Sequence, residues 1–307
     1  MKKTLRNILF GNIPVTEYST ITVKGDIQER VCLQTGNERM DVSTTHWLLC
    51  LDPVVFGIWF QKKEQAVFFN SGKKYKMCFT GSGNAGEPVA VLDLVFFNKI
   101  EEPDGILLLL KLEAAAIHHL NLIRTRLLFY KYYKKPEQDF YRLKSYAAAY
   151  SYPRRVRVVS FKEGDAYNIF PMDLVGDIPQ SNRYVLGLRH TNVTLARIIV
   201  TKKLAISEVP CQYKDTIYQL GKHHRGPMSS PGFNLIPSKN FGFPIPEWAN
   251  SYKELRINST INLGSHMLLW AEEIGQKTLR EPDGHLFHIH FLHYLGQYKK
   301  GLAYPLV

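Results

Sequence analysis

The chain has 307 residues, is 45% hydrophobic and 12% aromatic, and carries a formal net charge of +12. That length has room for two domains of ordinary size, and the apolar content is that of a globular protein rather than a disordered one. The strongest apolar run, residues 106–110, is followed by Lys111 and Glu113, which leaves it far short of the roughly 18 residues that a membrane span needs. We therefore expect a soluble protein without a membrane segment.

The N-terminus and the cysteines indicate a cytoplasmic protein. After Met1 only a short apolar stretch precedes Gly11, without a small-residue cleavage site, which argues against a secretory signal. The four cysteines are widely spaced and include no C-x-x-C pair: Cys32, Cys50, Cys78 and Cys211. Such spacing favours reduced thiols over a disulfide framework or a zinc site.

The positive charge raises the question of an acidic partner. The basic clusters are scattered from Lys2 to Lys300 without forming one stripe on one element. Basic and aromatic residues do alternate at 130–135, a pattern that can bind a nucleic acid strand, but amphipathic packing of a linker explains it as well. We take the clusters as solvated faces and do not expect nucleic acid as a partner.

The first 130 residues are predicted to form an N-terminal β domain, a candidate degenerate split barrel. Apolar or alternating segments rich in Val, Phe and Leu are separated by Gly, Asn and Pro turns, as is typical of short strands. The predicted strands are residues 31–35, 54–60, 66–69, 76–80, 89–97 and 106–117.

A glycine-rich segment in this half, Gly81-Ser-Gly-Asn-Ala-Gly86, matches the dinucleotide-binding pattern G-x-G-x-x-G. It follows a strand-like segment, which is half of the context that such a fingerprint requires. The other half is missing, because Pro88 and a second strand-like segment stand where a helix must begin. We predict a hairpin loop here.

Residues 131–154 are predicted to be a helical linker, because the composition shifts to Tyr, Lys, Gln and Ala and residues 136–150 have helical periodicity. Residues 155–307 are predicted to form a second mainly-β domain with one helix at 194–201. Its predicted strands are residues 156–161, 184–188, 204–207, 255–261, 267–274 and 286–291.

The two halves contain a weak internal repeat. Each has a strand, a glycine turn, a strand, a loop and a strand in this order, at 31–36, 40–45 and 54–58 in the first half and at 158–164, 168–173 and 184–188 in the second. The pattern suggests duplication of a barrel-like unit. Because this order is common in β proteins, coincidence stays open as the alternative.

One stretch of the second half has the character of an anion site. Thr191 stands where a predicted strand ends and an apolar helical pattern begins, so it is a candidate N-cap with Asn192 beside it. Free amides at the start of a helix, with Arg189 and His190 adjacent, would hold a phosphate group. The alternative is a plain capped helix with exposed charges.

A series of segments in the second half occurs in an order and spacing known from one family. The segments are residues 163–168, 177–179, 184–188, 189–191, 196–202, Gly264-Ser-His266 and Gly296-Gln-Tyr298. In these segments residues 155–307 resemble the flavin reductase-like FMN-binding split-barrel family. The resemblance covers about half of the chain, and for the first half it depends on the repeat alone. It implies a mainly-β split barrel, with a second tandem unit if the repeat is real.

The resemblance also implies a site. In the family the matching residues lie along the flavin ring or hold its phosphate, which implies cofactor contacts for Asn168, Ile169, Phe170, Pro171, Met172, Asp173, Arg189, His190, Thr191, Asn192 and Tyr298. His266 corresponds to a histidine bordering the reactive pocket, where it could orient substrate or transfer a proton; a hydrogen-bonded histidine at the start of a strand is the alternative.

The chain departs from the family at the flavin wall. Pro171 has no amide donor, and Asp173 would place negative charge near an electron-accepting ring. Ser265 also stands where the family more often has Asp. The departures at Pro171 and Asp173 put fast flavin reduction, and tight flavin binding, in doubt.

The predicted function is that of an FMN-binding flavin reductase-like protein, in which NADH or NADPH transfers a hydride to the flavin and a small-molecule acceptor is reduced. The alternative is a non-catalytic split-barrel binding or interaction module. Flavin reductases of this kind are usually homodimers, so we expect a homodimer or an internal pseudo-dimer. Four histidines at 285, 288, 290 and 293 lack a partner set of diagnostic spacing, and we expect no metal site.

Overall fold

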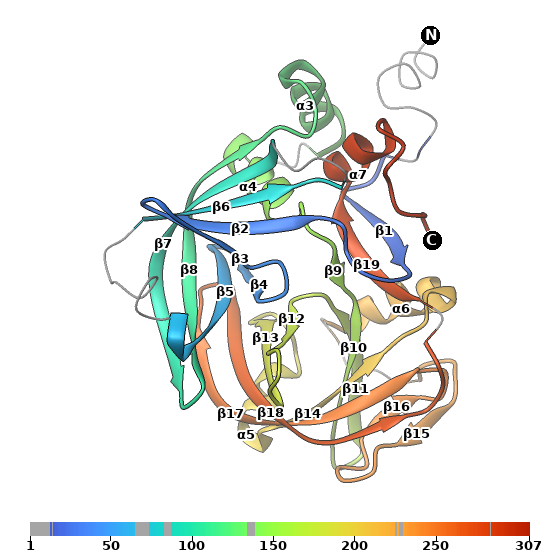
Figure 1. Ribbon diagram of the computed structural model, residues 1–307. Helices are drawn as coiled ribbons and strands as arrows, with labels where there is room; N and C mark the ends of the chain where they lie inside the picture. Colours follow the sequence, from blue (N-terminus) through green and yellow to red (C-terminus); the bar gives the residue numbers. More distant parts are fainter. Residues whose placement is uncertain are drawn as a thin grey trace.

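The computed structural model describes residues 13, 15–64, 74–82, 87–133, 139–224, 226, 230–282 and 284–307. Strands dominate it, as predicted, and most of them belong to two large sheets (Figure 1). The predicted strand at 66–69 lies outside the described residues. Within the described part of the chain, no helix has both the length and the apolar character to span a membrane.

The first sheet has seven strands in the order β3-β2-β6-β7-β8-β5-β4, and all neighbours are antiparallel. Its strands are β2 (Arg30–Thr35), β3 (Glu38–Asp41), β4 (His46–Leu51), β5 (Val54–Gln61), β6 (Lys74–Thr80), β7 (Pro88–Glu102) and β8 (Gly105–Ile117). We call this sheet the first unit. The short 3-10 helix η1 (Lys62–Glu64) follows β5.

The second sheet, which we call the second unit, also has seven antiparallel strands, in the order β11-β10-β14-β17-β18-β13-β12. Its strands are β10 (Arg157–Glu163), β11 (Ala166–Met172), β12 (Val175–Asp177), β13 (Arg183–Arg189), β14 (Lys203–Glu208), β17 (Ser251–Asn262) and β18 (His266–Thr278). Taken in chain order, these seven strands occupy the same places in their sheet as β2 to β8 occupy in theirs. The repeat expected from the sequence is therefore present as a repeat of strand order.

The loop with the G-x-G-x-x-G pattern joins β6 to β7. These strands are antiparallel neighbours, with Thr80 paired to Pro88. A strand therefore follows the glycines where a dinucleotide fold needs a helix, and the predicted hairpin is confirmed by its two flanks. Residues 83–86 themselves lie outside the described part of the chain.

The segment between the units is helical, as predicted, where the structure describes it. It contains α3 (Leu122–Leu128), the π-helical turn η2 (Phe129–Tyr133) and α4 (Phe140–Ala149). The chain then enters β9 (Arg154–Arg155), which leads directly into the second unit.

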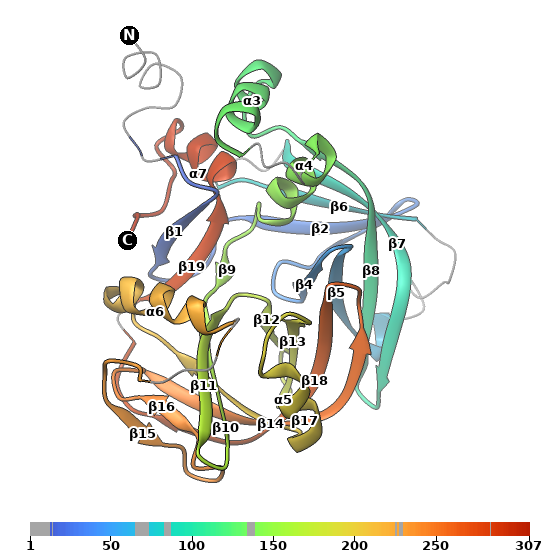
Figure 2. The same cartoon turned by 180° about the vertical axis from the view of Figure 1, so that it is seen from behind.

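A third, smaller sheet joins the two ends of the chain. It has the order β1-β19-β9, with β1 (Tyr18–Val23) and β19 (His285–His290) antiparallel along their whole length. An isolated bridge also joins Ile21 to Leu306. With α7 (Phe291–Tyr298), these strands lie beside the two large sheets in both views (Figures 1 and 2).

The remaining elements belong to the second half of the chain. They are α5 (Leu195–Thr201), η3 (Cys211–Tyr213), α6 (Lys214–Leu220), η4 (Gly221–His224), β15 (Leu235–Pro237) and β16 (Pro244–Pro246). The last two form a separate small hairpin.

The two units dock through reciprocal turns. The β4–β5 turn of the first unit meets the β17–β18 turn of the second, where Ser265 donates its amide to the Asp52 carbonyl at 2.7 Å. At the other end, Arg183 of the second unit pairs with Asp104, in the β7–β8 turn of the first, at 2.5 Å. Each unit therefore contributes two turns, and the β4–β5 turn of the first has the same place in its sheet as the β12–β13 turn of the second, as expected of a pair related by a two-fold axis.

Apolar packing joins the units between these turns. Trp59 stacks on Trp270 with 6.0 Å between ring centroids. A Cβ added to Gly187 would lie 1.9 Å from the backbone oxygen of Leu49, so only glycine allows this approach. The largest hydrophobic cluster also contains buried residues of both sheets. The units therefore share a core.

Candidate functional site

A pocket of about 260 Å³ opens at the end of the second unit, facing the first. We call it the Arg189 pocket. It is lined by Leu51, Tyr150, Phe170, Pro171, Met172, Asp173, Leu174, Gly187, Leu188, Arg189, Gly221, His224 and His266. Six of the predicted site residues are thus brought together, from three separate strand ends: the end of β11, the end of β13 and the start of β18.

The pocket is formed by strand pairing. Arg189 and His266 are opposite each other in the antiparallel ladder of β13 and β18. Segment 170–174 crosses beside them, because the Gly187 amide donates to the Leu174 carbonyl at 2.9 Å. Backbone hydrogen bonds therefore bring three predicted parts of the site together: the flavin wall at 170–173, the phosphate-binding Arg189 and His266.

Three more predicted residues lie in a hydrogen-bond network at η4, beside the pocket. His224 contacts the Thr191 hydroxyl at 3.3 Å and the Asn192 amide at 3.1 Å. Asn168 donates to the Thr194 hydroxyl at 2.7 Å and to the His223 carbonyl at 2.9 Å. His223 and His224 were not among the predicted site residues, because nothing local in the sequence indicates their distant partners.

The predicted N-cap is wrong. Helix α5 begins at Leu195, and its N-cap position is Thr194, whose side chain makes no capping hydrogen bond. The reason is local: the Asn192 side chain accepts the Thr194 amide at 2.9 Å, which forms a turn before the helix. The amides that were expected to hold a phosphate beside Thr191 are therefore not at the start of the helix.

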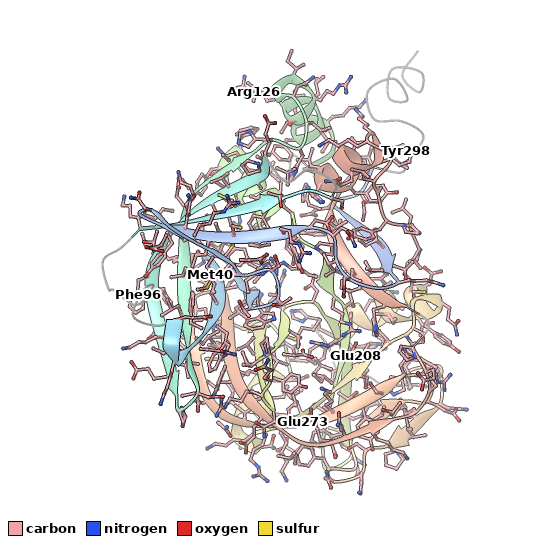
Figure 3. The ribbon with its side chains drawn as sticks, in the orientation of Figure 1. Met40, Phe96, Arg126, Glu208, Glu273 and Tyr298 are labelled. Carbon is pink, nitrogen blue, oxygen red and sulfur yellow. The ribbon has the colours of Figure 1, made fainter. Side chains whose placement is uncertain are left out.

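The other predicted residues lie outside the pocket lining. Ile169 is buried in a hydrophobic cluster with Val158 and Ile217. His190 is exposed and contacts the Asn262 side chain at 3.2 Å. Tyr298 ends α7, far from the β17–β18 region where Glu273 lies (Figure 3).

His266 is a neutral, incompletely bonded histidine in the pocket wall. Its side chain is buried, and Nδ1 lies 2.8 Å from the Ser265 hydroxyl. Nε2 is buried and has no hydrogen-bond partner within the described residues. Burial, with the charge of Arg189 next, lowers the pKa of His266 to about 3. A buried polar atom without a partner is costly, so a ligand that hydrogen-bonds to it gains this energy back.

The structure explains Asp173, the residue that departs most from the family. Burial alone would raise the pKa of Asp173, but the hydrogen bond from His288 and the charge of Arg154 hold it below its ordinary value. His288 Nδ1 lies 2.8 Å from the carboxylate. Behind it, His288 Nε2 meets the Tyr218 hydroxyl, which lies 2.7 Å from the Thr20 hydroxyl. Asp173 is therefore ionised and held by a chain of partners from distant segments.

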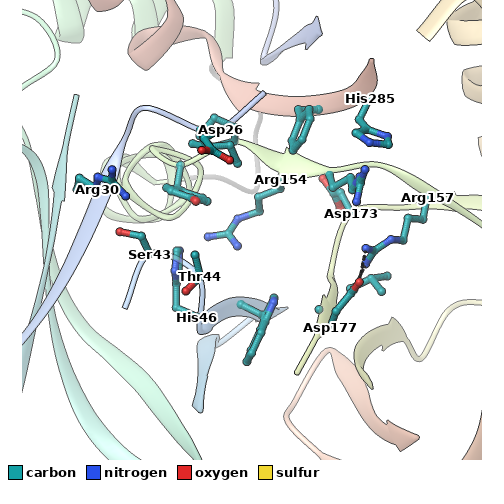
Figure 4. A pocket seen from close by; sticks show the side chains of 18 of the residues that line it. Asp26, Arg30, Ser43, Thr44, His46, Arg154, Arg157, Asp173, Asp177 and His285 are labelled. Atoms are coloured by element: carbon teal, nitrogen blue, oxygen red, sulfur yellow. Dashed lines mark hydrogen bonds and ion pairs between the residues drawn. The ribbon is translucent and has the colours of Figure 1, made fainter. Parts of the chain in front are cut away.

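A second and larger cavity, of about 660 Å³, lies between the two units and the β1–β19 sheet. We call it the inter-unit cavity; Asp173 lines both spaces. Arg154 points into it, with Arg30, Ser43 and Thr44 on one side and the Arg157–Asp177 pair on the other (Figure 4). No local sequence pattern marks this cavity, because the residues that line it come from five separate segments, within 25–30, 43–47, 152–157, 173–177 and 285–287.

Within the described residues, no group of three or more His, Cys, Asp or Glu side chains is placed to hold a metal ion. Three of the four histidines near the C-terminus have other hydrogen-bond partners. His288 bonds to Asp173, His290 accepts the Leu292 amide, and His293 contacts Glu29 at 3.1 Å.

About half of the chain is similar in structure to flavin reductases and FMN-binding proteins. The NADH:FAD oxidoreductase SgcE6 of Streptomyces globisporus is matched over 50% of this chain and 90% of its own, with a TM-score of 0.43 and 18% identity. An FMN-binding protein of Thermus thermophilus is matched over 48% and 78%, with a TM-score of 0.40 and 19% identity. The flavin reductase PheA2 is matched over 47% and 94%, with a TM-score of 0.40 and 15% identity. No protein-family model and no curated protein matches the sequence.

Proposed function

We propose that this protein binds FMN in the Arg189 pocket and that NADH or NADPH reduces the bound flavin. The observation that carries the proposal is that segment 170–174, Arg189 and His266 line one pocket. These are the residues to which the family resemblance assigns the ring wall, the anion contact and the reactive edge. Residues 155–307 would be the flavin domain, with 1–130 as its degenerate partner and 131–154 as the linker.

The groups in the pocket fit a flat ligand with an anionic tail. Phe170, Met172 and Leu188 give apolar surface, and His266 Nε2 is a buried atom in need of a partner. Arg189 is exposed, and no carboxylate of the described residues forms an ion pair with it. A free guanidinium binds phosphate oxygens in a bidentate manner. The volume of about 260 Å³ is near the lower end of small-molecule sites, so part of the ligand would stay outside.

Bound flavin would supply the chemistry, as an acceptor of a hydride. The protein would position the flavin ring and polarise it. Neutral His266 would form a hydrogen bond at the ring edge without adding charge, because its pKa lies far below neutral pH. Asp173 would add negative charge, which disfavours electron uptake, but its hydrogen bond from His288 disperses that charge.

We also propose that the two units act as an internal pseudo-dimer, so that one chain supplies both sides of the site. Leu51 of the first unit lines the Arg189 pocket together with the second unit. A monomer in sedimentation analysis that still binds flavin would agree with this. Flavin binding only by a dimer of whole chains would contradict it.

The test of flavin binding compares FMN with riboflavin, which lacks the phosphate. Wild-type protein should bind FMN, with a change in the visible spectrum and quenched flavin fluorescence. Arg189→Gln should weaken FMN binding about tenfold or more, as expected for a lost charged hydrogen bond, and leave riboflavin binding nearly unchanged. Arg256→Gln, an exposed arginine whose contact with Glu272 is 3.9 Å long, is the matched control. A protein that takes up neither ligand rules out the proposal.

The second candidate function, a flavin-binding module without turnover, is favoured by Pro171 and Asp173. Pro171 offers the ring no amide donor, and Asp173 is ionised. Anaerobic addition of NADH and NADPH to the FMN-loaded protein separates the two candidates. Loss of the oxidised-flavin absorption supports the reductase. Stable absorption with FMN still bound supports the flavin-binding module without turnover.

A further inference from the structure

We propose that the inter-unit cavity is a second binding site, for a small organic anion with a carboxylate or phosphate head and an apolar body. Arg154 is its central residue. This inference does not depend on flavin binding, because the cavity and the Arg189 pocket share only Asp173 among their lining residues.

Arg154 is a buried cation that forms no ion pair with a described carboxylate; the nearest compensating charge is that of Asp173, which lines the same cavity and is hydrogen-bonded to His288. Arg154 is only 6% exposed. Nε and Nη2 donate to one acceptor, the Ala149 carbonyl, at 3.3 and 2.7 Å. The guanidinium lies over the rings of Phe56 and Tyr150, 5.4 and 5.7 Å from their centroids. These contacts fix its direction toward the cavity (Figure 4) but leave its charge without an ion pair among the described residues.

Two other arginines of the cavity, in contrast to Arg154, form ion pairs with carboxylates. Arg157 forms ion pairs with Asp177 and Glu208, both at 2.6 Å, and Arg155 pairs with Glu208 at 3.0 Å. The cavity therefore has a neutralised wall at this end. The opposite end holds Arg154 and Arg30, and neither forms an ion pair with a described carboxylate.

That opposite end has further groups for an oxyanion. Arg30 faces it from β2, exposed and likewise without an ion pair to a described carboxylate. Thr44 presents an exposed side chain with a hydroxyl from the β3–β4 turn (Figure 4). Asp26 also lines the cavity and, like Arg30, it is exposed, so solvent screens both of these charges more than that of buried Arg154. Asp173 is engaged by His288.

The cost of a buried, unpaired charge is the physical reason for a ligand. An isolated buried ion is strongly destabilising unless a partner and hydrogen bonds compensate it. Burial lowers the pKa of Arg154 to about 10, so the side chain remains a cation at neutral pH. An oxyanion at the guanidinium removes the penalty, and arginine binds such groups with well-defined geometry.

Apolar surface defines the rest of the ligand. Trp47, Val175 and Phe287 line the same cavity. The Trp47 ring lies so close to Gly176 that a Cβ there would be 2.1 Å from it, so this wall is held in place. A bare inorganic ion would leave these surfaces in contact with water, whereas an organic anion covers them.

The test uses three probes that share one body: phenyl phosphate, benzoate and neutral phenol. Calorimetric titration of the full-length protein should show binding of phenyl phosphate, of benzoate or of both, and phenol should bind at least about tenfold more weakly. The stronger of the two anions identifies the head group. No heat from either anion at millimolar concentration, or equal binding of phenol, overturns the proposal.

Two kinds of variant locate the site. Arg154→Gln should weaken binding of the preferred anion by about tenfold or more, because a charged hydrogen-bonding group is lost. Because Arg154 is buried and Arg154→Gln could unfold the protein, Thr44→Glu is the second test: it leaves the core intact and places a negative charge beside the anion. Its matched control is Thr44→Gln, which should bind within about twofold of wild type. Unchanged affinity in Thr44→Glu, with native folding, contradicts the assignment.

A competition experiment separates this cavity from the flavin site. Saturating phenyl phosphate should leave FMN affinity unchanged, and Thr44→Glu should bind FMN as wild type does. If FMN instead displaces the anion, the inter-unit cavity holds part of the flavin and is not a second site. If FMN never binds but the anion does, the proposed function fails while this inference stands.

Discussion

At matched positions of the two units, the first has Trp59 and Leu107 where the second has Arg189 and His266. The match is set by Gly57 in β5 and Gly187 in β13, which lie two residues before Trp59 and Arg189. In both sheets, the residue opposite belongs to the first residues of the neighbouring strand. Leu107 of β8 pairs with Trp59, and His266 of β18 pairs with Arg189. The same scaffold therefore carries an apolar pair in one unit and a polar pair in the other.

The apolar pair closes the first unit. The ring of Trp59 covers Gly105, where an added Cβ would lie 2.4 Å from it, and Trp59 also stacks on Trp270 of the second unit. Leu107 is fully buried in the same cluster. The first unit thus uses this position for packing between the units, whereas the second leaves it open as the Arg189 pocket.

The largest effect is expected when the two units, which share a core, are separated. A fragment of residues 152–307 should fail to fold cooperatively, because β19 would lose its partner β1 and the cluster around Trp270 would lose Trp59 and Leu107. Circular dichroism during heating measures this, with the full chain as reference. Co-expression with residues 1–151 should restore a soluble complex. A soluble fragment with a sharp transition of its own would mean that the second unit is independent.

The two matched glycines provide a finer comparison. In Gly187→Ala the new Cβ would meet the Leu49 backbone oxygen at 1.9 Å, whereas in Gly57→Ala the nearest atom is Leu49 Cδ1, at 2.6 Å. Backbone yields less easily than the end of a side chain. We expect a loss of about 3 kcal/mol or more in the free energy of unfolding for Gly187→Ala and about 1 kcal/mol for Gly57→Ala. Urea denaturation measures both, and an equal loss in the two variants would refute the difference.

The repeat also indicates what the sequence could predict. Strands such as β5, β8 and β13 are apolar runs, and their local pattern was sufficient to find them. β1 was missed because its partner β19 lies more than 250 residues away in the chain. The pairing of Asp173 with His288 is equally remote, so the sequence shows the carboxylate without the partner that holds it. Residues 170–173, Arg189 and His266, to which the resemblance assigns one site, line one pocket, whereas Tyr298 lies on α7 and is not part of that lining.

Exchanging the polar and apolar residues should separate stability from binding. His266→Leu removes a buried nitrogen without a partner, so the protein should be unchanged or about 1 kcal/mol more stable, while FMN affinity falls. Leu107→His places a polar ring in a fully buried site and should cost about 2 to 4 kcal/mol. Urea denaturation and FMN titration of both variants are required. A large loss of stability in His266→Leu would show that this histidine is structural.

The smallest expected effect is on the pH dependence of stability. Burial lowers the pKa of His46 in the first unit, and of His266 and His290, to about 3. The ordinary value of about 6.5 applies in the unfolded chain, so below it the unfolded state binds protons that the folded state does not. Stability is therefore full above pH 6.5 and falls as the pH decreases toward 3. Each such histidine contributes a slope of about 1.4 kcal/mol per pH unit.

The variant His266→Leu isolates one of these slopes. Carboxylates such as Glu208 are present in both proteins, so their contribution cancels in the comparison. Between pH 6 and pH 4.5 the slope of the unfolding free energy against pH should be smaller in His266→Leu than in wild type, by about 1.4 kcal/mol per pH unit. His190→Leu, at an exposed position beside the same pocket, is the control and should keep the wild-type slope. Urea denaturation at a series of pH values gives the slopes. Equal slopes in wild type and His266→Leu would mean that His266 takes up its proton in the folded protein as readily as in the unfolded chain, and it could not then serve as the neutral wall of the Arg189 pocket.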